Sequence, residues 1–143
     1  MAIDPASLQE VLALAQVCED LARAALKVAQ DQLRAKQISQ SEFDQAFGDY
    51  GLAMQKARDM YYQASHDLAH SVAQGADCKA LAAQTKALGE SLGRLQKVEH
   101  VLAISFGVVT LVASIATAVG APSEHTLAGA ANAANSLKTA IGF

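Results

Sequence analysis

Apolar residues in the first part of the chain recur at alternating steps of three and four positions. This spacing gives a repeat of about 3.5 residues, which is typical of a helix packed lengthwise against another helix. Asp4 and Pro5 suit the N-cap and the first helical position, because the missing N–H of proline is not needed there. The pattern predicts a helix over about 5–36, whose apolar seam is Val11, Leu14, Cys18, Leu21, Ala25 and Val28.

A second helix is predicted over about 40–74. Ser39 and Glu42 stand in the S-x-x-E pattern of a capping box, and Ile38 and Phe43 are placed as its hydrophobic staple. Because only about three residues link the two helices, we expect them to lie antiparallel as one long helical hairpin. The apolar seam of the second helix is Phe43, Phe47, Tyr50, Met54, Ala57, Tyr61, Ala64 and Leu68.

A third long helix follows, and Asp77 is suited to cap it. Packing beside the hairpin places this helix parallel to the first one. Continuation through Gly107 is left open by the sequence: an unbroken helix over 78–120 would be about 64 Å long, so a kink or a protrusion is favoured there. The leucines that recur every seven residues are Leu81, Leu88, Leu95 and Leu102.

A final helix is predicted over about 123–141, capped by Ser123, and its Gly, Ala and Asn content makes it weak alone. The expected fold class is therefore all-α. It comprises the long hairpin, a third long helix and a short C-terminal helix in an elongated bundle of three or four helices. One structural domain is expected, with an amphipathic bundle over 1–100, an apolar helix over 101–121 and a C-terminal segment over 122–143.

Composition narrows the function classes. Apolar residues make up 52% and charged residues 17%, which excludes an intrinsically disordered chain, and the net charge of −3 lacks the basic excess of a nucleic-acid binder. Cys18 and Cys78 do not form a disulfide framework, because the expected packing separates them by about 20 Å. Residues 1–30 carry acidic side chains and no secretory signal pattern, so a cytoplasmic or membrane-associated protein is expected.

The segment 101–121 contains no charged residue and is long enough to cross a bilayer, which takes about 20 residues. A helix that is apolar on all sides is either a bundle core or a membrane span. A bundle this small leaves one helix face open, so lipid, a partner protein or a second copy of the chain is expected to cover it. Ten of the eleven Lys and Arg residues precede this segment, which favours a cytoplasmic N-terminal hairpin if the segment spans. The expected contact residues are Val101, Leu102, Ile104, Phe106, Val108, Val109, Leu111, Val112, Ile115 and Val119.

Histidines supply the remaining candidate chemistry. His66 and His70 share one helix face, but zinc needs three or four ligands, so a solvated pair is favoured over a metal site. Together with His100 they are candidates for an acid sensor that releases the apolar segment. No catalytic motif is present, so neither an enzyme nor a bound metal or cofactor is expected.

Two functions from different classes follow. The first is a non-enzymatic, membrane-active or membrane-anchored helical protein, whose segment 101–121 inserts into a bilayer, either as a constitutive anchor or after release from the soluble bundle. The second is a soluble protein–protein interaction module, such as a chaperone, an adaptor or a toxin-neutralising immunity-type partner, that buries the same segment in its core or interface. A homo-oligomer is compatible with both.

Overall fold

A computed structural model describes residues 5–66, 75–94, 101–120 and 124–142, and this part of the chain is all-helical, without strands. The predicted all-α class is thereby confirmed. The helices are α1 (Pro5–Arg34), α2 (Gln40–His66), α3 (Gly75–Gly93), α4 (Val101–Gly120) and α5 (Glu124–Ile141).

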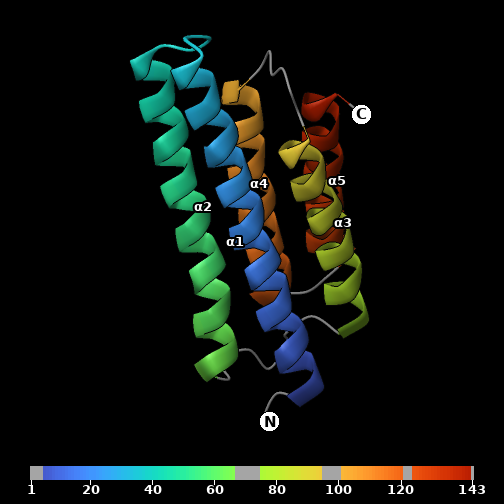
Figure 1. The fold of residues 1–143 in the computed structure, drawn as a ribbon. Coiled ribbons are helices and arrows are strands. Elements are labelled where there is room, and N and C mark those ends of the chain that lie inside the picture. Colours follow the sequence, from blue (N-terminus) through green and yellow to red (C-terminus); the bar gives the residue numbers. More distant parts are fainter. Residues whose placement is uncertain (1–4, 67–74, 95–100, 121–123, 143) are drawn as a thin grey trace.

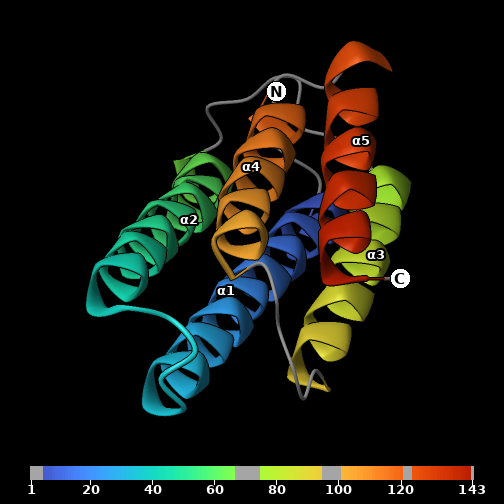
Figure 2. The same ribbon diagram turned by 90° about the horizontal axis from the view of Figure 1, so that it is seen from above.

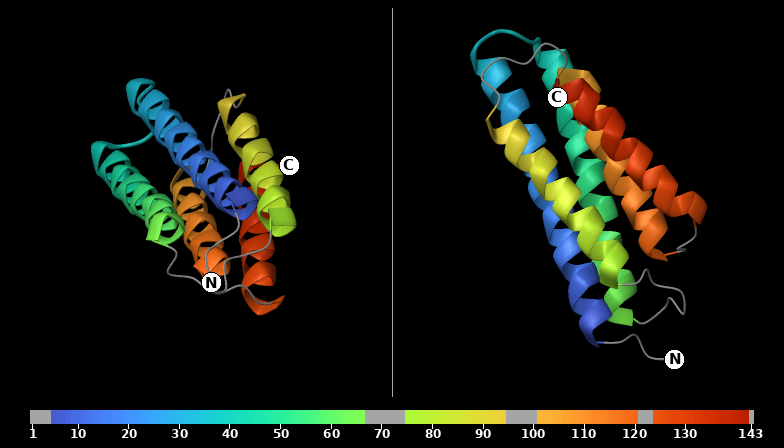
Figure 3. Two further views of the ribbon diagram at one scale, coloured as in Figure 1. Left: turned by 90° about the horizontal axis from the view of Figure 1, so that it is seen from below. Right: turned by 90° about the vertical axis from the view of Figure 1, so that its right-hand side faces the viewer.

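The helices pack side by side as one bundle (Figure 1). Helices α1, α3 and α5 run in one direction, and α2 and α4 run in the other (Figures 1 and 3). Helix α1 packs between α2 and α3, and α4 packs between α2 and α5 (Figure 2). Contacts between α3 and α5 close the ring, and α1 and α4 meet across its centre. Helices α1 and α4 therefore each pack against three other helices.

The number of helices differs from the predicted three or four. Helix α4 runs opposite to α3, so an unbroken helix over 78–120 is excluded; the connection at 95–100 lies outside the described residues. Reversal lets two helices bury their apolar sides against neighbours, whereas an unbroken one would project beyond them. Helix α4 passes through Gly107 without a break, and α5 has 18 residues against 19 in α3, so it is a full member of the bundle.

The turn between α1 and α2 contains the predicted capping box. The backbone N–H of Glu42 donates to Ser39 Oγ at 3.1 Å, and that of Ser39 donates to Glu42 Oε1 at 3.0 Å. Ile38 and Phe43 are half-buried against the same small apolar cluster, as a hydrophobic staple requires. The sequence pattern therefore located the start of α2 correctly.

Helix α1 ends two residues earlier than predicted. The N–H of Gln37 donates to the carbonyl of Gln32 at 2.8 Å, and the N–H of Lys36 donates to that of Leu33 at 3.0 Å. Lys36 has φ 60°, the left-handed conformation usually taken by glycine in this Schellman arrangement. A helix ending with a lysine at that position is not signalled by composition, which explains the error.

The core confirms the seam of α1, and on α2 it confirms Met54 and Ala57 but not Phe47. All six predicted seam residues of α1 are buried. On α2, Phe47 was expected in the core but is 54% exposed, whereas Ala46, Ala53 and Met60 are buried. A two-helix hairpin needs one seam, but α2 also packs against α4, so its buried side is shifted and lined by small alanines that allow close approach. The predicted part of this helix at 67–74 lies outside the described residues.

The last three helices also contribute to the core. Leu81 and Leu88 are buried as predicted, whereas Leu102 belongs to α4 and is half-buried; Leu95 lies outside the described residues. Asp77 stands inside the first turn of α3, which begins at Gly75, rather than before the helix. The buried residues of α5 are Ala130, Ala133, Ala134 and Leu137.

Candidate functional site on helix α4

Helix α4 has 20 residues and no ionisable side chain. Its length is about 30 Å, which equals the thickness of a bilayer hydrocarbon core. By length and composition it could cross a membrane, a test that core helices of soluble proteins also meet. The position of α4 in the bundle is therefore needed to compare it with a core helix.

One side of α4 belongs to the core of the bundle. It packs against α1, α2 and α5, and ten of its residues are buried. Seven of the ten predicted contact residues lie on this side: Val101, Ile104, Val108, Leu111, Val112, Ile115 and Val119. In the folded bundle these side chains contact protein, and they reach lipid or a partner only after α4 moves.

The opposite side of α4 is open to solvent and uncharged. Phe106 is 66% exposed, the largest fraction among the exposed large apolar side chains of the described residues. Ala103, Thr110 and Thr117 are exposed on the same side, at helical spacing from Phe106. We call these four residues the open face of α4. The predicted contact residues Leu102 and Val109 are half-buried.

The hydroxyl groups of the open face are already hydrogen-bonded within the helix. Thr110 Oγ1 donates to the carbonyl of Phe106 at 3.0 Å, and Thr117 Oγ1 donates to that of Ala113, also at 3.0 Å. Threonine commonly satisfies its donor in this way inside apolar surroundings. The open face therefore presents methyl groups and an aromatic ring, with no donor that needs water.

Ser105 makes a polar contact between α4 and α2. Ser105 is buried, and its Oγ donates to Asp49 Oδ2 at 2.9 Å, with the Ala46 carbonyl oxygen at 3.4 Å. The half-buried Asp49 carboxylate retains access to water. This pair was not predicted, because nothing in the local pattern of either helix relates residue 49 to residue 105.

Helix α5 covers α4 at close range. Gly107 packs against Leu137, and a Cβ placed on Gly107 would lie 3.1 Å from Leu137 Cδ1. The absence of a side chain at Gly107 therefore lets the two helices approach. The buried side of α5 is otherwise made of alanines, which favour the same close packing.

Further exposed apolar side chains lie on α2. Phe47 has ring contacts with Phe43 and Tyr50, at centroid distances of 6.2 and 6.0 Å. Leu52 is 50% exposed and Tyr62 is 57% exposed on the same helix. These residues form no continuous stripe, because Phe47 and Leu52 are separated by about 140° around the helix.

The predicted histidine sensor is not tested by the structure. His66 is the last residue of α2, and its side chain lies outside the described residues, as do His70 and His100. The acid-sensor role stays a prediction. Among the side chains that the structure describes, no group of three or more His, Cys, Asp or Glu could hold a metal ion.

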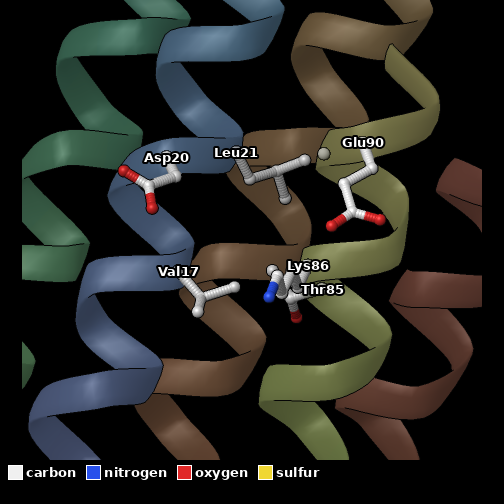
Figure 4. Close-up of a pocket in the computed structure, with 7 residues that line it drawn as sticks. Val17, Asp20, Leu21, Thr85, Lys86 and Glu90 are labelled. Atoms are coloured by element: carbon white, nitrogen blue, oxygen red, sulfur yellow. The ribbon is translucent and has the colours of Figure 1, made fainter. Parts of the chain in front are cut away.

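A groove of about 410 Å³ lies between α1 and α3 (Figure 4). The lining surface is mainly apolar, and the carboxylates of Asp20 and Glu90 come from the two opposite helices, with Lys86 also in the groove. Asp20 is paired with Arg23 at 3.3 Å, and Glu90 with Arg94 at 3.7 Å. Each of the two carboxylates therefore already has a cationic partner on its own helix. The full lining is Val17, Asp20, Leu21, Thr85, Lys86, Gly89 and Glu90.

The buried thiol of Cys18 belongs to the core rather than to a reactive site. Its side chain is fully buried on α1, and burial, together with the neighbouring Glu19 charge, raises its pKa to about 12. A protonated thiol is a poor nucleophile, so this cysteine is inert in the folded bundle.

Comparison with known proteins adds no relative from which a function could be transferred. No protein-family model, curated protein or solved structure matches this chain significantly.

Proposed function

We propose that this protein is a non-enzymatic, membrane-active helical bundle, in which α4 is the segment that binds and enters the bilayer. The observation that supports this most is the uncharged open face of α4. A helix on the outside of a soluble bundle ordinarily carries charged residues toward solvent, and α4 carries none over its 20 residues.

Transfer of α4 to lipid is physically feasible because the helix exchanges one apolar environment for another. Its backbone hydrogen bonds are internal, as a lipid environment requires, and Thr110 and Thr117 are satisfied within the helix. The open face gains from burial at about 25 cal/mol per Å² of apolar surface. The cost is the loss of the contacts of α4 with α1, α2 and α5, including the hydrogen bond between Ser105 and Asp49.

The test is flotation of the full chain with vesicles of phosphatidylcholine and phosphatidylglycerol. Phe106→Asp should abolish flotation, because an aspartate in a membrane helix costs about 2.5–3.5 kcal/mol near its centre. Phe47→Asp is the matched control, since Phe47 is a similarly exposed phenylalanine on α2, outside the open face. Equal flotation of both variants and the unmodified chain, or no flotation of any, would contradict the proposal.

Point substitutions are preferable to removal of the segment. A chain that ends before α4 would lose ten buried residues and the partner surface of α2 and α5. Loss of flotation by such a chain would then report unfolding as much as loss of the lipid contact.

The second candidate is an interaction module whose partner is a protein. The exposed Phe47, Leu52 and Tyr62 on α2 favour it, because aromatic residues are enriched where proteins bind one another. Under this function the full chain stays soluble without flotation, and light scattering detects a complex or an oligomer that Phe47→Asp weakens. The two functions therefore differ in whether the unmodified chain floats with vesicles and in which phenylalanine, Phe106 or Phe47, the interaction depends on.

A further inference from the structure

We infer that the groove between α1 and α3 is a binding site for a small amphiphilic carboxylate, whose head group meets Thr85 and Lys86 and whose alkyl chain lies along the apolar lining. This site is separate from the open face of α4, and the inference does not depend on the proposed function. The groove has a volume of about 410 Å³, within the range of about 300–1,000 Å³ that small-molecule pockets occupy.

Gly89 leaves room in the groove between the two helices. A Cβ placed on Gly89 would lie 3.9 Å from both Cα and Cδ1 of Leu21, which is ordinary van der Waals contact. Because glycine has no side chain, position 89 contributes nothing that would fill the space in front of Leu21. Val17 lies one turn before Leu21 on the same face of α1. An alkyl chain would therefore meet the apolar surface that ligand pockets usually provide.

Thr85 supplies a buried hydroxyl that needs an acceptor. This residue lines the groove and is 1% exposed, and its Oγ1 has no hydrogen-bond partner among the described residues. By contrast, Ser91, Thr110 and Thr139 each donate to the carbonyl oxygen four residues earlier. Buried polar groups are almost always hydrogen-bonded, and one without a partner lowers stability. Thr85 therefore marks a position where an oxygen atom of a ligand can complete the hydrogen bonding.

The charged groups of the groove favour an anionic ligand. Asp20 Oδ1 already accepts a hydrogen bond from Arg23 at 3.3 Å, and the Asp20 carboxylate points away from α3 (Figure 4). Glu90 is paired with Arg94 at 3.7 Å. Lys86 is exposed and has no ion pair with a described residue, and Figure 4 shows its Nζ between the two helices. Lys86 is therefore the lining charge that remains for a ligand.

A carboxylate is the head group that satisfies both Thr85 and Lys86. One of its oxygens can accept from Thr85 Oγ1 while the other meets the ammonium group of Lys86. An alcohol offers no charge to Lys86, and an ammonium head offers no acceptor to Thr85 and is repelled by Lys86. Because Leu21 and Gly89 lie one turn further along their helices, the alkyl chain extends beside them.

The test is an NMR titration of the ¹⁵N-labelled full chain with octanoate, octanol and octylammonium, each below the concentration at which it aggregates. We expect octanoate to bind most tightly and to shift the amide signals of the groove, and high salt to weaken its binding because Lys86 is exposed. Tighter binding of octylammonium would show that the carboxylates define the site and would overturn the inference. So would a lack of octanoate binding, or shifts confined to the open face of α4.

Substitutions of the two polar residues separate binding from folding. Thr85→Val keeps the shape of the side chain without its hydroxyl, and should weaken octanoate binding about tenfold, as loss of a hydrogen bond to a charged group does. The same variant should unfold at an equal or higher temperature, because a hydroxyl without a partner is removed. Lys86→Gln should weaken binding about two- to fivefold, the range of exposed ion pairs. Lys56→Gln, at an exposed lysine of α2, is the matched control and should bind octanoate normally.

Filling the groove tests its location. Gly89→Leu should abolish octanoate binding, whereas Phe106→Asp on the open face of α4 should leave it intact. Unchanged binding by Gly89→Leu would overturn the inference. Should circular dichroism show that this variant does not fold, the decision rests on Thr85→Val and Lys86→Gln, and unchanged affinity of both overturns it. Flotation of Gly89→Leu with vesicles should equal that of the unmodified chain, so this inference and the proposed function fail independently.

Discussion

Leu137 of α5 lies against Gly107 of α4, so that a Cβ on Gly107 would be 3.1 Å from Leu137 Cδ1 and 3.8 Å from Leu137 Cα. An alanine at 107 would need Leu137 to move by only a few tenths of an ångström. A leucine has no such space, because the α5 backbone is close behind. Gly107→Leu should therefore lower the free energy of unfolding by about 1–3 kcal/mol, as overpacked cores do, measured by urea denaturation.

The control for that variant is a glycine without a neighbour. A Cβ on Gly48 of α2 would meet no atom within 4 Å. Gly48→Ala should raise the free energy of unfolding by about 0.5–1 kcal/mol, because alanine loses less backbone entropy in a helix. If Gly107→Leu and Gly48→Ala had the same effect, the close approach of α4 and α5 would be refuted.

Replacing Lys36 with glycine should stabilise the folded chain. Its φ of 60° is the conformation that glycine adopts without steric cost, while other L-residues pay about 1–2 kcal/mol. Lys36→Gly should raise the midpoint of urea denaturation. The gain in unfolding free energy is at most about 1 kcal/mol, because glycine also makes the unfolded chain more flexible. Gln37→Gly, one residue further on, is the control and should not stabilise.

The hydrogen bond between Ser105 and Asp49 should control how easily α4 leaves the bundle. Asp49→Ala removes the acceptor that lies 2.9 Å from Ser105 Oγ and should cost about 1 kcal/mol of stability. The same variant should bind vesicles faster, because less must be broken to release α4. Asp44→Ala, an exposed carboxylate on the same helix, should leave the binding rate unchanged. A slower rate for Asp49→Ala would contradict release of α4 from α2.

The buried thiol of Cys18 makes stability depend on alkaline pH. Burial, with a contribution from Glu19, raises its pKa from 9.0 to about 12, so the folded state keeps the proton that the unfolded state loses. The contribution of this pKa difference to the unfolding free energy is complete below pH 9 and is lost as the pH rises toward 12. The loss is at most about 4 kcal/mol, at about 1.4 kcal/mol per pKa unit. The difference in unfolding free energy between the unmodified chain and Cys18→Ala should therefore shrink over this range. A constant difference would show that the thiol is not buried in solution.

Local patterns were sufficient for those elements whose signals lie within one helix. The capping box of Ser39 and Glu42 and the seam of α1 were predicted correctly, because each depends on residues spaced three or four positions apart along the chain. The side that α2 buries was predicted only in part: Met54 and Ala57 are buried as expected and Phe47 is not, since that side depends on α4, far away in sequence.

In the candidate site, too, features that lie within one helix were predictable, and features that depend on tertiary packing were not. The absence of charge over 101–121 was readable from the sequence and identified α4. Its periodicity could not separate the buried side from the open face, because both are apolar; only the positions of α1, α2 and α5 determine that Phe106 points outward while Ile115 is in the core. The pair of Ser105 and Asp49 and the approach of Gly107 to Leu137 likewise depend on tertiary packing.

The central claim is that the open face of α4 contacts lipid, and tryptophan fluorescence tests it most directly. The chain contains no tryptophan, so Phe106→Trp provides a single probe on the open face and Phe47→Trp a similarly exposed probe on α2. With vesicles containing brominated acyl chains, we expect a blue shift and strong quenching for the probe at 106, and neither for the probe at 47. An unchanged spectrum at position 106 in the presence of excess vesicles would show that the open face of α4 does not contact lipid.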